Sequence, residues 1–332
     1  MRGRGVRIFG LLLILAVVGL ASLLIGPVRL PAIAIVQVLF GGGREGTLNA
    51  DAIVWELRLP RIALAALVGM ALGAAGAAYQ GLFRNPLADP FVIGASSGSA
   101  LGATLVIVSG AHTGALGFGA VPIGGFLGAI GAAAIVYVST AWWGRMPLVG
   151  LLLAGSAVSS CLGAMVWLLM VLHDEDLGQI VAWLMGSLGG RGWPAVDGGA
   201  PFIVLGVAGL CALSRPLDAL SLGEQPAKAL GLPLTLVSGA VVAAASLATA
   251  AAVAVAGIIG FVGLIAPHLA RVCVGARHRY LVPASGLTGA ILLLLADDLA
   301  RTIAAPVELP VGVLTAILGG PFFLVVLGMR TR

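Results

Sequence analysis

Charged residues are scarce in this chain. Asp, Glu, Lys and Arg make up 9% of the 332 residues, and Lys228 is the only lysine. Soluble domains contain roughly 25% charged residues, so a water-soluble globule is excluded. No G-x-x-x-x-G-K-[ST] phosphate loop is present either. We therefore expect that this chain does not hydrolyse ATP itself.

Residues suited to metal or redox chemistry are equally few. The three cysteines, Cys161, Cys211 and Cys273, lie in or beside apolar segments and show no disulfide or metal-ligand spacing. We interpret them as packing residues. His268 follows Pro267 with no second His, Cys or carboxylate at metal spacing, and it is as compatible with a capping or interface role as with ligation. We predict no catalytic residue and no metal site.

Apolar and small residues are abundant instead. Hydrophobic residues make up 60% of the chain, glycine occurs 50 times, and the mean hydropathy is +1.13. Membrane helices use small residues where their backbones approach each other. The sequence therefore predicts an all-α integral membrane protein, with residues 1–332 forming a single transmembrane domain. Ten spans are predicted, at about 8–27, 60–82, 91–110, 115–140, 148–172, 198–213, 233–250, 257–270, 281–297 and 309–328.

The distribution of charge predicts the orientation. An apolar run from Ile8 to Ile25 follows three arginines, and we expect it to be retained as the first span, because it is longer than a signal-peptide core and lacks a convincing cleavage site. With ten crossings, the face that carries both termini has twelve basic and three acidic residues, and the opposite face has six basic and ten acidic ones. The positive-inside rule then places both termini in the cytoplasm.

The inner loop 214–231 has the pattern of two short helices in tandem. Pro216 and Pro226 suit first helical turns, and Gly223 and Gly231 suit C-terminal caps. Helices this short are unstable alone in water, so they must pack on something. The apolar contacts would come from Leu217, Leu220, Leu222 and Leu230. Packing on the chain's own membrane domain and docking of a cytoplasmic partner both remain open.

Polar residues at the span ends have plain structural explanations. Pro86 and Pro90 mark a helix stop after the second span. Asp297 and Asp298 fall at the outer end of a span, where we expect helix-end solvation or ion pairing rather than ion coupling. Three arginines lie near span ends on the outer face: Arg58, Arg61 and Arg301. These are expected to be solvated or paired within the chain, with Glu56 and Glu308 available as partners.

Six motifs in order along nearly the whole chain resemble one family. They are Leu57-Arg58-Leu59-Pro60-Arg61; Gln80 with Phe83-Arg84-Asn85-Pro86-Leu87-Ala88-Asp89-Pro90; Trp183-Leu184-Met185-Gly186-Ser187-Leu188; Leu222-Gly223 with Ala229-Leu230-Gly231; Gly260-Phe261-Val262-Gly263-Leu264-Ile265-Ala266-Pro267-His268; and Glu308-Leu309-Pro310-Val311-Gly312. Each string alone is weak. Together they resemble the permeases of the iron-siderophore, heme and cobalamin ABC importers.

This resemblance implies a ten-helix subunit of the cobalamin-permease fold in the inner membrane, with the transport pathway between two copies. The implied partners are a second copy, two cytoplasmic ATPase subunits that use ATP and Mg, an extracytoplasmic binding protein and the lipid bilayer. No nucleic acid and no cofactor held by this chain are implied.

The resemblance also assigns roles to individual residues. ATPase coupling is implied for Leu217, Leu220, Leu222, Gly223, Glu224, Pro226, Ala227, Lys228, Leu230 and Gly231. A cytoplasmic gate is implied for Asn85, Pro86, Leu87, Leu148 and Val149. Docking of acidic groups of the binding protein is implied for Arg58, Arg61 and Arg301.

The gate differs from that of cobalamin permeases. These carry small hydroxyl residues where this chain has Leu148 and Val149, so the gate does not favour cobalamin. An apolar gate closes by packing and dewetting, which fits any large substrate. The sequence leaves open which of the ferric siderophore, heme and cobalamin classes is carried. An ion-coupled secondary transporter is the alternative function.

Overall fold

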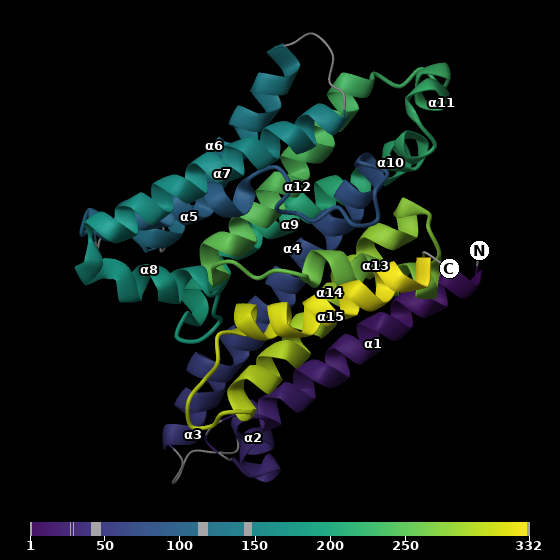
Figure 1. Ribbon diagram of the computed structural model, residues 1–332. Coiled ribbons are helices and arrows are strands. Elements are labelled where there is room, and N and C mark those ends of the chain that lie inside the picture. The colour runs from purple at the N-terminus through teal and green to yellow at the C-terminus, as the bar shows by residue number, and fades with distance from the viewer. Residues whose placement is uncertain are drawn as a thin grey trace.

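The computed structural model is almost entirely helical (Figure 1). It describes residues 2–26, 28, 30–40, 48–111, 119–142 and 148–330, and no strand occurs among these residues. The longer helices are α1 (Arg2–Leu24), α4 (Leu59–Leu82), α5 (Ala95–Val108), α6 (Ala120–Trp142), α7 (Leu148–Leu172), α9 (Gly192–Ala212), α12 (Leu234–Ala256), α13 (Val262–Val274), α14 (His278–Thr302) and α15 (Val311–Arg330). The shorter elements are α2 (Ala32–Leu39), α3 (Leu48–Ala52), a π-helical turn (Ile53–Arg58), a 3-10 turn (Asp174–Asp176), α8 (Leu177–Leu184), α10 (Ser214–Ser221) and α11 (Glu224–Ala229).

Each of the ten predicted spans coincides with one of the longer helices. Seven helices of the described chain are long and apolar enough to cross a membrane, and three apolar helices, Ala95–Val108, Val262–Val274 and Val311–Val325, are shorter. The number of crossings therefore stays a prediction. The expected turn near His112 lies outside the described residues.

Two of the predicted spans begin four or five residues before their helices for a clear structural reason. Helix α5 begins at Ala95 rather than at residue 91, because turns follow Pro90 and Gly94 adopts a positive φ of 82°. Helix α13 begins at Val262 rather than at residue 257, because Gly257, with a φ of 72°, ends α12 and a non-helical stretch follows. Backbone without helical hydrogen bonds is tolerated at membrane depth only where protein surrounds it. Gly257 and Ile259 are both buried.

Helices α4, α12 and α14 form the interior of the molecule. Glycines allow α4 and α14 to pack backbone against backbone: a Cβ atom added at Gly69 would lie 2.3 Å from the carbonyl oxygen of Gly289. Helices α5 and α6 meet in the same way, at Gly98 and Gly128. Lipid tails are as apolar as leucine, so close packing of small residues holds membrane helices together. Many of the glycines in the sequence therefore lie at these helix–helix contacts.

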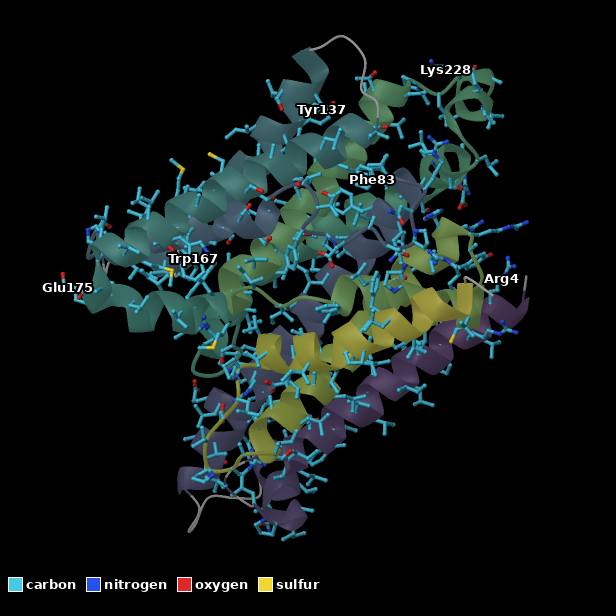
Figure 2. The ribbon with its side chains drawn as sticks, viewed as in Figure 1. Arg4, Phe83, Tyr137, Trp167, Glu175 and Lys228 are labelled. Atoms are coloured by element: carbon cyan, nitrogen blue, oxygen red, sulfur yellow. The ribbon has the colours of Figure 1, made fainter. Side chains whose placement is uncertain are left out.

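The outer helices expose apolar side chains. Phe9 and Leu13 of α1 are 68% and 58% exposed, and Trp167 and Val171 of α7 are 69% and 77% exposed. Trp167 is labelled on α7 in Figure 2. Such a surface is stable against hydrocarbon and not against water. The protein is a multi-pass membrane protein.

The two ends of the helix bundle differ in character. Both ends of the chain lie at the same end of the molecule as α10 and α11, and α2, α3 and α8 lie at the opposite end (Figure 1). Lys228 and Arg4 are likewise far from Glu175 (Figure 2). This arrangement agrees with the division of charges made from the sequence. We call the end with α10 and α11 the inner end and the other the outer end.

We expect Gly128→Ala to destabilise the fold by about 1–3 kcal/mol, because overpacking at a tight contact forces the backbones apart. The added Cβ atom would lie 2.1 Å from the carbonyl oxygen of Gly98. Thermal unfolding of the purified protein in detergent measures the change. Gly131→Ala on the same helix is the matched control, since nothing lies within 4 Å of its Cβ position. Equal unfolding midpoints for the two variants would show that the α5–α6 contact is not close-packed.

Candidate functional site

The three outer arginines named from the sequence line one cavity at the outer end. Arg58 ends the π-helical turn, Arg61 lies in the first turn of α4, and Arg301 lies near the end of α14. The cavity measures about 180 Å³, and Arg191 and two glutamates, Glu56 and Glu308, also line it. Segments far apart in the sequence thus bring four arginines and two glutamates to one place.

Arg61 forms a bidentate ion pair with Asp297. Its Nε lies 2.8 Å from Asp297 Oδ2, and its Nη2 donates to Asp297 Oδ1 at 2.9 Å. Its Nη1 donates to Glu308 Oε2 at 2.7 Å. The planar guanidinium fork matches the two carboxylate oxygens, which makes this the strongest kind of ion-pair geometry. The pair fixes the start of α4 against the end of α14.

Arg301 is almost fully enclosed. Its side chain is 2% exposed, its Nε lies 3.3 Å from Asp297 Oδ2, and its Nη2 pairs with Asp298 Oδ1. Ser22 of α1 completes the network, because its hydroxyl donates to Asp298 Oδ1 at 2.6 Å and accepts from Arg301 Nη2. The ion pairing expected for Asp297 and Asp298 is confirmed. Neither aspartate is available as an unpaired carboxylate.

Arg58 is held differently. It is 4% exposed, and its two Nη atoms donate to the carbonyl oxygens of Leu23 and Val28. No carboxylate of the described residues pairs with it, so the expected partner Glu56 is not used. Arg58 and Arg301 are therefore buried rather than exposed on the surface. Buried guanidinium groups need hydrogen-bond partners inside the protein, and both arginines have them. Both line the cavity.

Arg191 is a cavity residue that the sequence reasoning missed. It lies in the turn Gly189-Gly190-Arg191-Gly192, where Gly190 and Gly192 adopt φ values of 69° and 61°. No ion pair to Arg191 occurs within the described part of the chain. The sequence feature that could have indicated a functional role for Arg191 is its position between two glycines in a loop otherwise rich in acidic residues.

At the inner end, the two predicted tandem helices are present as α10 and α11. Their leucines divide into two groups. Leu217 and Leu220 are 0% and 5% exposed and pack into the core of the membrane domain together with Ala227, whereas Leu222 and Leu230 are 72% and 68% exposed. Packing on the chain's own membrane domain is therefore confirmed for Leu217 and Leu220, and docking of a partner stays a prediction for Leu222 and Leu230. Gly223 and Gly231 adopt positive φ, and Glu224 begins α11.

Asp218 attaches α10 to the membrane helices. Its Oδ1 accepts from the backbone N–H of His278 at 2.6 Å and lies 2.9 Å from His278 Nδ1. The carboxylate thereby caps the N-terminus of α14, where negative charge is stabilising. The His278 ring in turn packs on Gly81 of α4, where an added Cβ would lie 2.2 Å from Nε2. Helix α10 is thus fixed to both α14 and α4.

The expected gate residues lie in two segments. The Asn85 side chain accepts from the N–H of Leu87 at 3.0 Å, which closes a turn, and Pro86 and Leu87 border a small hollow lined by α13 and α15. Val149, in the first turn of α7, is 64% exposed, and the side chain of Leu148 lies outside the described part.

Asp89 lies at the end of the same turn region. Burial raises the pKa of its carboxyl group to about 6, although a hydrogen bond from the N–H of Phe91 at 2.8 Å opposes the rise. This carboxyl group therefore titrates closer to neutrality than an exposed aspartate does.

The fold and its two polar ends are those of a membrane permease, with a lipid-exposed helical body, a cavity for charged groups at one end and short surface helices at the other. The sequence matches the FecCD transport family over residues 13–329. The chain belongs to this family.

Similar proteins are named as permeases of import or transport systems. The chain is 44% identical over 288 residues to the cobalamin import system permease protein BtuC of Halobacterium salinarum, covering 85% of this chain and 75% of that protein. It is 41% identical over 292 residues to the hemin transport system permease protein HmuU of Yersinia pestis, covering 82% of each. A solved structure, described as the inward-facing conformation of an ABC transporter assigned to the metal-chelate type, has a TM-score of 0.86 at 35% identity and covers 97% and 98% of the two chains.

We expect Asp297→Asn to destabilise the protein by about 3 kcal/mol, because it leaves Arg61 and Arg301 without their shared buried carboxylate. Glu308→Gln is the matched control. It also removes a carboxylate partner of Arg61, but Glu308 is 36% exposed, and exposed pairs contribute at most about 1 kcal/mol. Unfolding midpoints in detergent compare the two variants. A larger loss for Glu308→Gln would contradict the central position given to Asp297.

Proposed function

We propose that this chain is the permease subunit of an ATP-driven importer for a metal chelate. In this proposal two copies enclose the transport pathway, two ATPase subunits bind at the inner end, and an extracytoplasmic binding protein delivers the substrate at the outer end. The observation that carries the proposal is membership of the FecCD transport family over residues 13–329. Relatives named for cobalamin and for hemin fit a chelate as the cargo class.

The inner end supplies the coupling surface in this proposal. Leu222 and Leu230 enter a cleft of the ATPase subunit, because exposed apolar side chains at a surface mark sites of protein–protein contact. The same surface includes Gly223, Glu224, Pro226, Lys228 and Gly231. Leu217, Leu220 and Ala227 support the surface from beneath, because they pack into the membrane domain. Asp218 and His278 then transmit a displacement of α10 to α14.

The outer cavity receives acidic side chains of the binding protein in this proposal. Arg58 and Arg191 have no carboxylate partner among the described residues, so an entering carboxylate need not displace an existing one from them. Arg61 and Arg301 hold the wall of the cavity through Asp297. In a dimer, the cavity occurs twice and offers two symmetry-related anchors for one binding protein.

The gate in this proposal is closed by apolar packing. The Asn85-Pro86-Leu87 turn lies beside α13 and α15, and Leu148 and Val149 contribute from the start of α7. A constriction of this kind excludes water without contacting a particular chemical group of the substrate. Selection among chelates is then the task of the binding protein.

ATP-driven uptake by the reconstituted complex tests the function. Proteoliposomes that contain this chain and its ATPase subunit, supplied with the binding protein, should accumulate one of three probes: a ferric siderophore, hemin or cobalamin. We expect Leu222→Asp combined with Leu230→Asp to reduce ATPase co-purification and uptake by about tenfold or more. Each substitution removes apolar area that the proposed contact with the ATPase subunit would bury.

The control for this experiment is Leu222→Met combined with Leu230→Met, which preserves the apolar volume and should retain uptake. Membrane insertion should be equal in both double variants. Uptake driven by a proton or sodium gradient, with no ATPase present, would overturn the importer in favour of a secondary transporter.

The outer cavity predicts an electrostatic effect on docking. We expect Arg191→Glu to slow association of the binding protein several-fold at low salt, because charges at the rim of an interface mainly set the association rate. Arg191→Lys keeps the charge and should retain most of the rate. Surface plasmon resonance with the reconstituted complex, at low and high ionic strength, measures both. An unchanged rate in Arg191→Glu, together with no salt dependence in the wild type, would remove this cavity from the interface.

A further inference from the structure

Four arginines lie close together at the inner end, where α1 passes the turn between α13 and α14. They are Arg4 and Arg7 of α1, Arg277 directly before α14, and Arg279 in its first turn. We call them the α1–α14 arginine cluster. Arg4 lies at the end of the molecule that carries the N-terminus, far from Glu175 (Figure 2). The cluster is separate from the outer cavity and is formed by helices other than α10 and α11.

Two of these arginines share one aromatic ring. The guanidinium carbon of Arg4 lies 5.6 Å from the centroid of Tyr280, and that of Arg279 lies 5.7 Å from the same centroid. Nη1 of Arg7 donates to the carbonyl oxygen of Cys273, near the end of α13, at 2.6 Å. A guanidinium that stacks on a ring through its face keeps the N–H donors of its edge for oxygen anions. The Tyr280 ring thus brings the guanidinium groups of Arg4 and Arg279 to one place.

Among the described residues, no carboxylate forms an ion pair with these four arginines. Residues 1–44 and 225–296 contain no Asp or Glu at all. Asp218, which reaches the start of α14, is already bonded to the backbone and ring of His278. Arg7, Arg277 and Arg279 are exposed. The cluster is thus a surface whose unmatched charges attract an anion.

Exposed apolar side chains adjoin the arginines in the chain. Val6 and Phe9 of α1 are 69% and 68% exposed, and Val272 near the end of α13 is 77% exposed. A ligand that satisfies this surface carries a negative oxygen group beside hydrocarbon. Free phosphate would leave the apolar side chains uncovered.

We propose that the α1–α14 arginine cluster binds the headgroup phosphate of an anionic phospholipid in the leaflet at the inner end. The acyl chains then cover Val6, Phe9 and Val272, and Tyr280 lies at headgroup depth, as is usual for tyrosine in membrane proteins. The positive-inside tendency accounts for arginines at this end of the molecule. It does not account for two guanidinium groups on one ring beside exposed hydrocarbon-facing residues.

Lipid binding by the purified full-length protein tests this. Native mass spectrometry counts retained lipids after addition of phosphatidylglycerol, phosphatidylcholine or inorganic phosphate to the protein in detergent. We expect the wild type to retain phosphatidylglycerol preferentially. Arg4→Gln combined with Arg279→Gln should lower this preference by about fivefold per arginine, which corresponds to about 1 kcal/mol for each basic residue at a membrane surface.

The control is Arg215→Gln, which removes one positive charge from an exposed position on α10 and should keep the preference. Arg279→Gln alone serves if the double variant does not fold. Equal retention of phosphatidylglycerol and phosphatidylcholine by the wild type would overturn the proposal. So would full competition by equimolar inorganic phosphate, or an equal loss of preference in Arg215→Gln.

Discussion

The backbones of α4 and α14 touch along the middle of the molecule, and both polar ends depend on this contact. Gly69 and Gly289 leave no side chain between the two helices. At the outer end the same pair brings Arg61 of α4 to Asp297 of α14. At the inner end it brings Gly81 of α4 to the ring of His278 of α14. Larger side chains in the middle would separate the partners at both ends.

The outer network shows how a membrane protein retains charge inside its fold. An ionisable group in a low-dielectric environment is costly unless it is paired and hydrogen-bonded. Arg61, Arg301, Asp297 and Asp298 meet this condition by sharing partners, and Ser22 of α1 supplies a further hydrogen bond. The network also joins α1 to the α4–α14 pair. Arg58 and Arg191 remain as the cavity arginines without a carboxylate among the described residues.

The α4–α14 pair links the two surfaces that the proposed importer uses. Asp218 and His278 connect α10 to α14 by hydrogen bonds, and Arg301 near the end of α14 lines the cavity that is proposed to receive the binding protein. Tightly packed interfaces change between discrete arrangements rather than deforming continuously. The pair is therefore suited to move as one body between the inner and outer ends.

Composition and spacing predicted the class of protein, the approximate positions of the ten apolar segments, and the tandem helices α10 and α11. The family followed from the resemblance of six motifs to known permeases. These features depend on local patterns: hydrophobic length, proline and glycine at helix ends, and short motifs in order. Helix starts at Ala95 and Val262 were missed, because positive φ at Gly94 and Gly257 is set by packing rather than by apolar content.

Only the tertiary structure decided which side chains meet. It made Asp297 the shared partner of Arg61 and Arg301, enclosed Arg58 among carbonyl groups, added Arg191 to the cavity, and divided Leu217 and Leu220 from Leu222 and Leu230. The contacts of Arg61 with Asp297 and Glu308 join residues more than two hundred positions apart, and no local pattern records such a distance. Burial of a leucine on a short helix likewise depends on the neighbour that covers it, which the sequence of the helix alone does not contain.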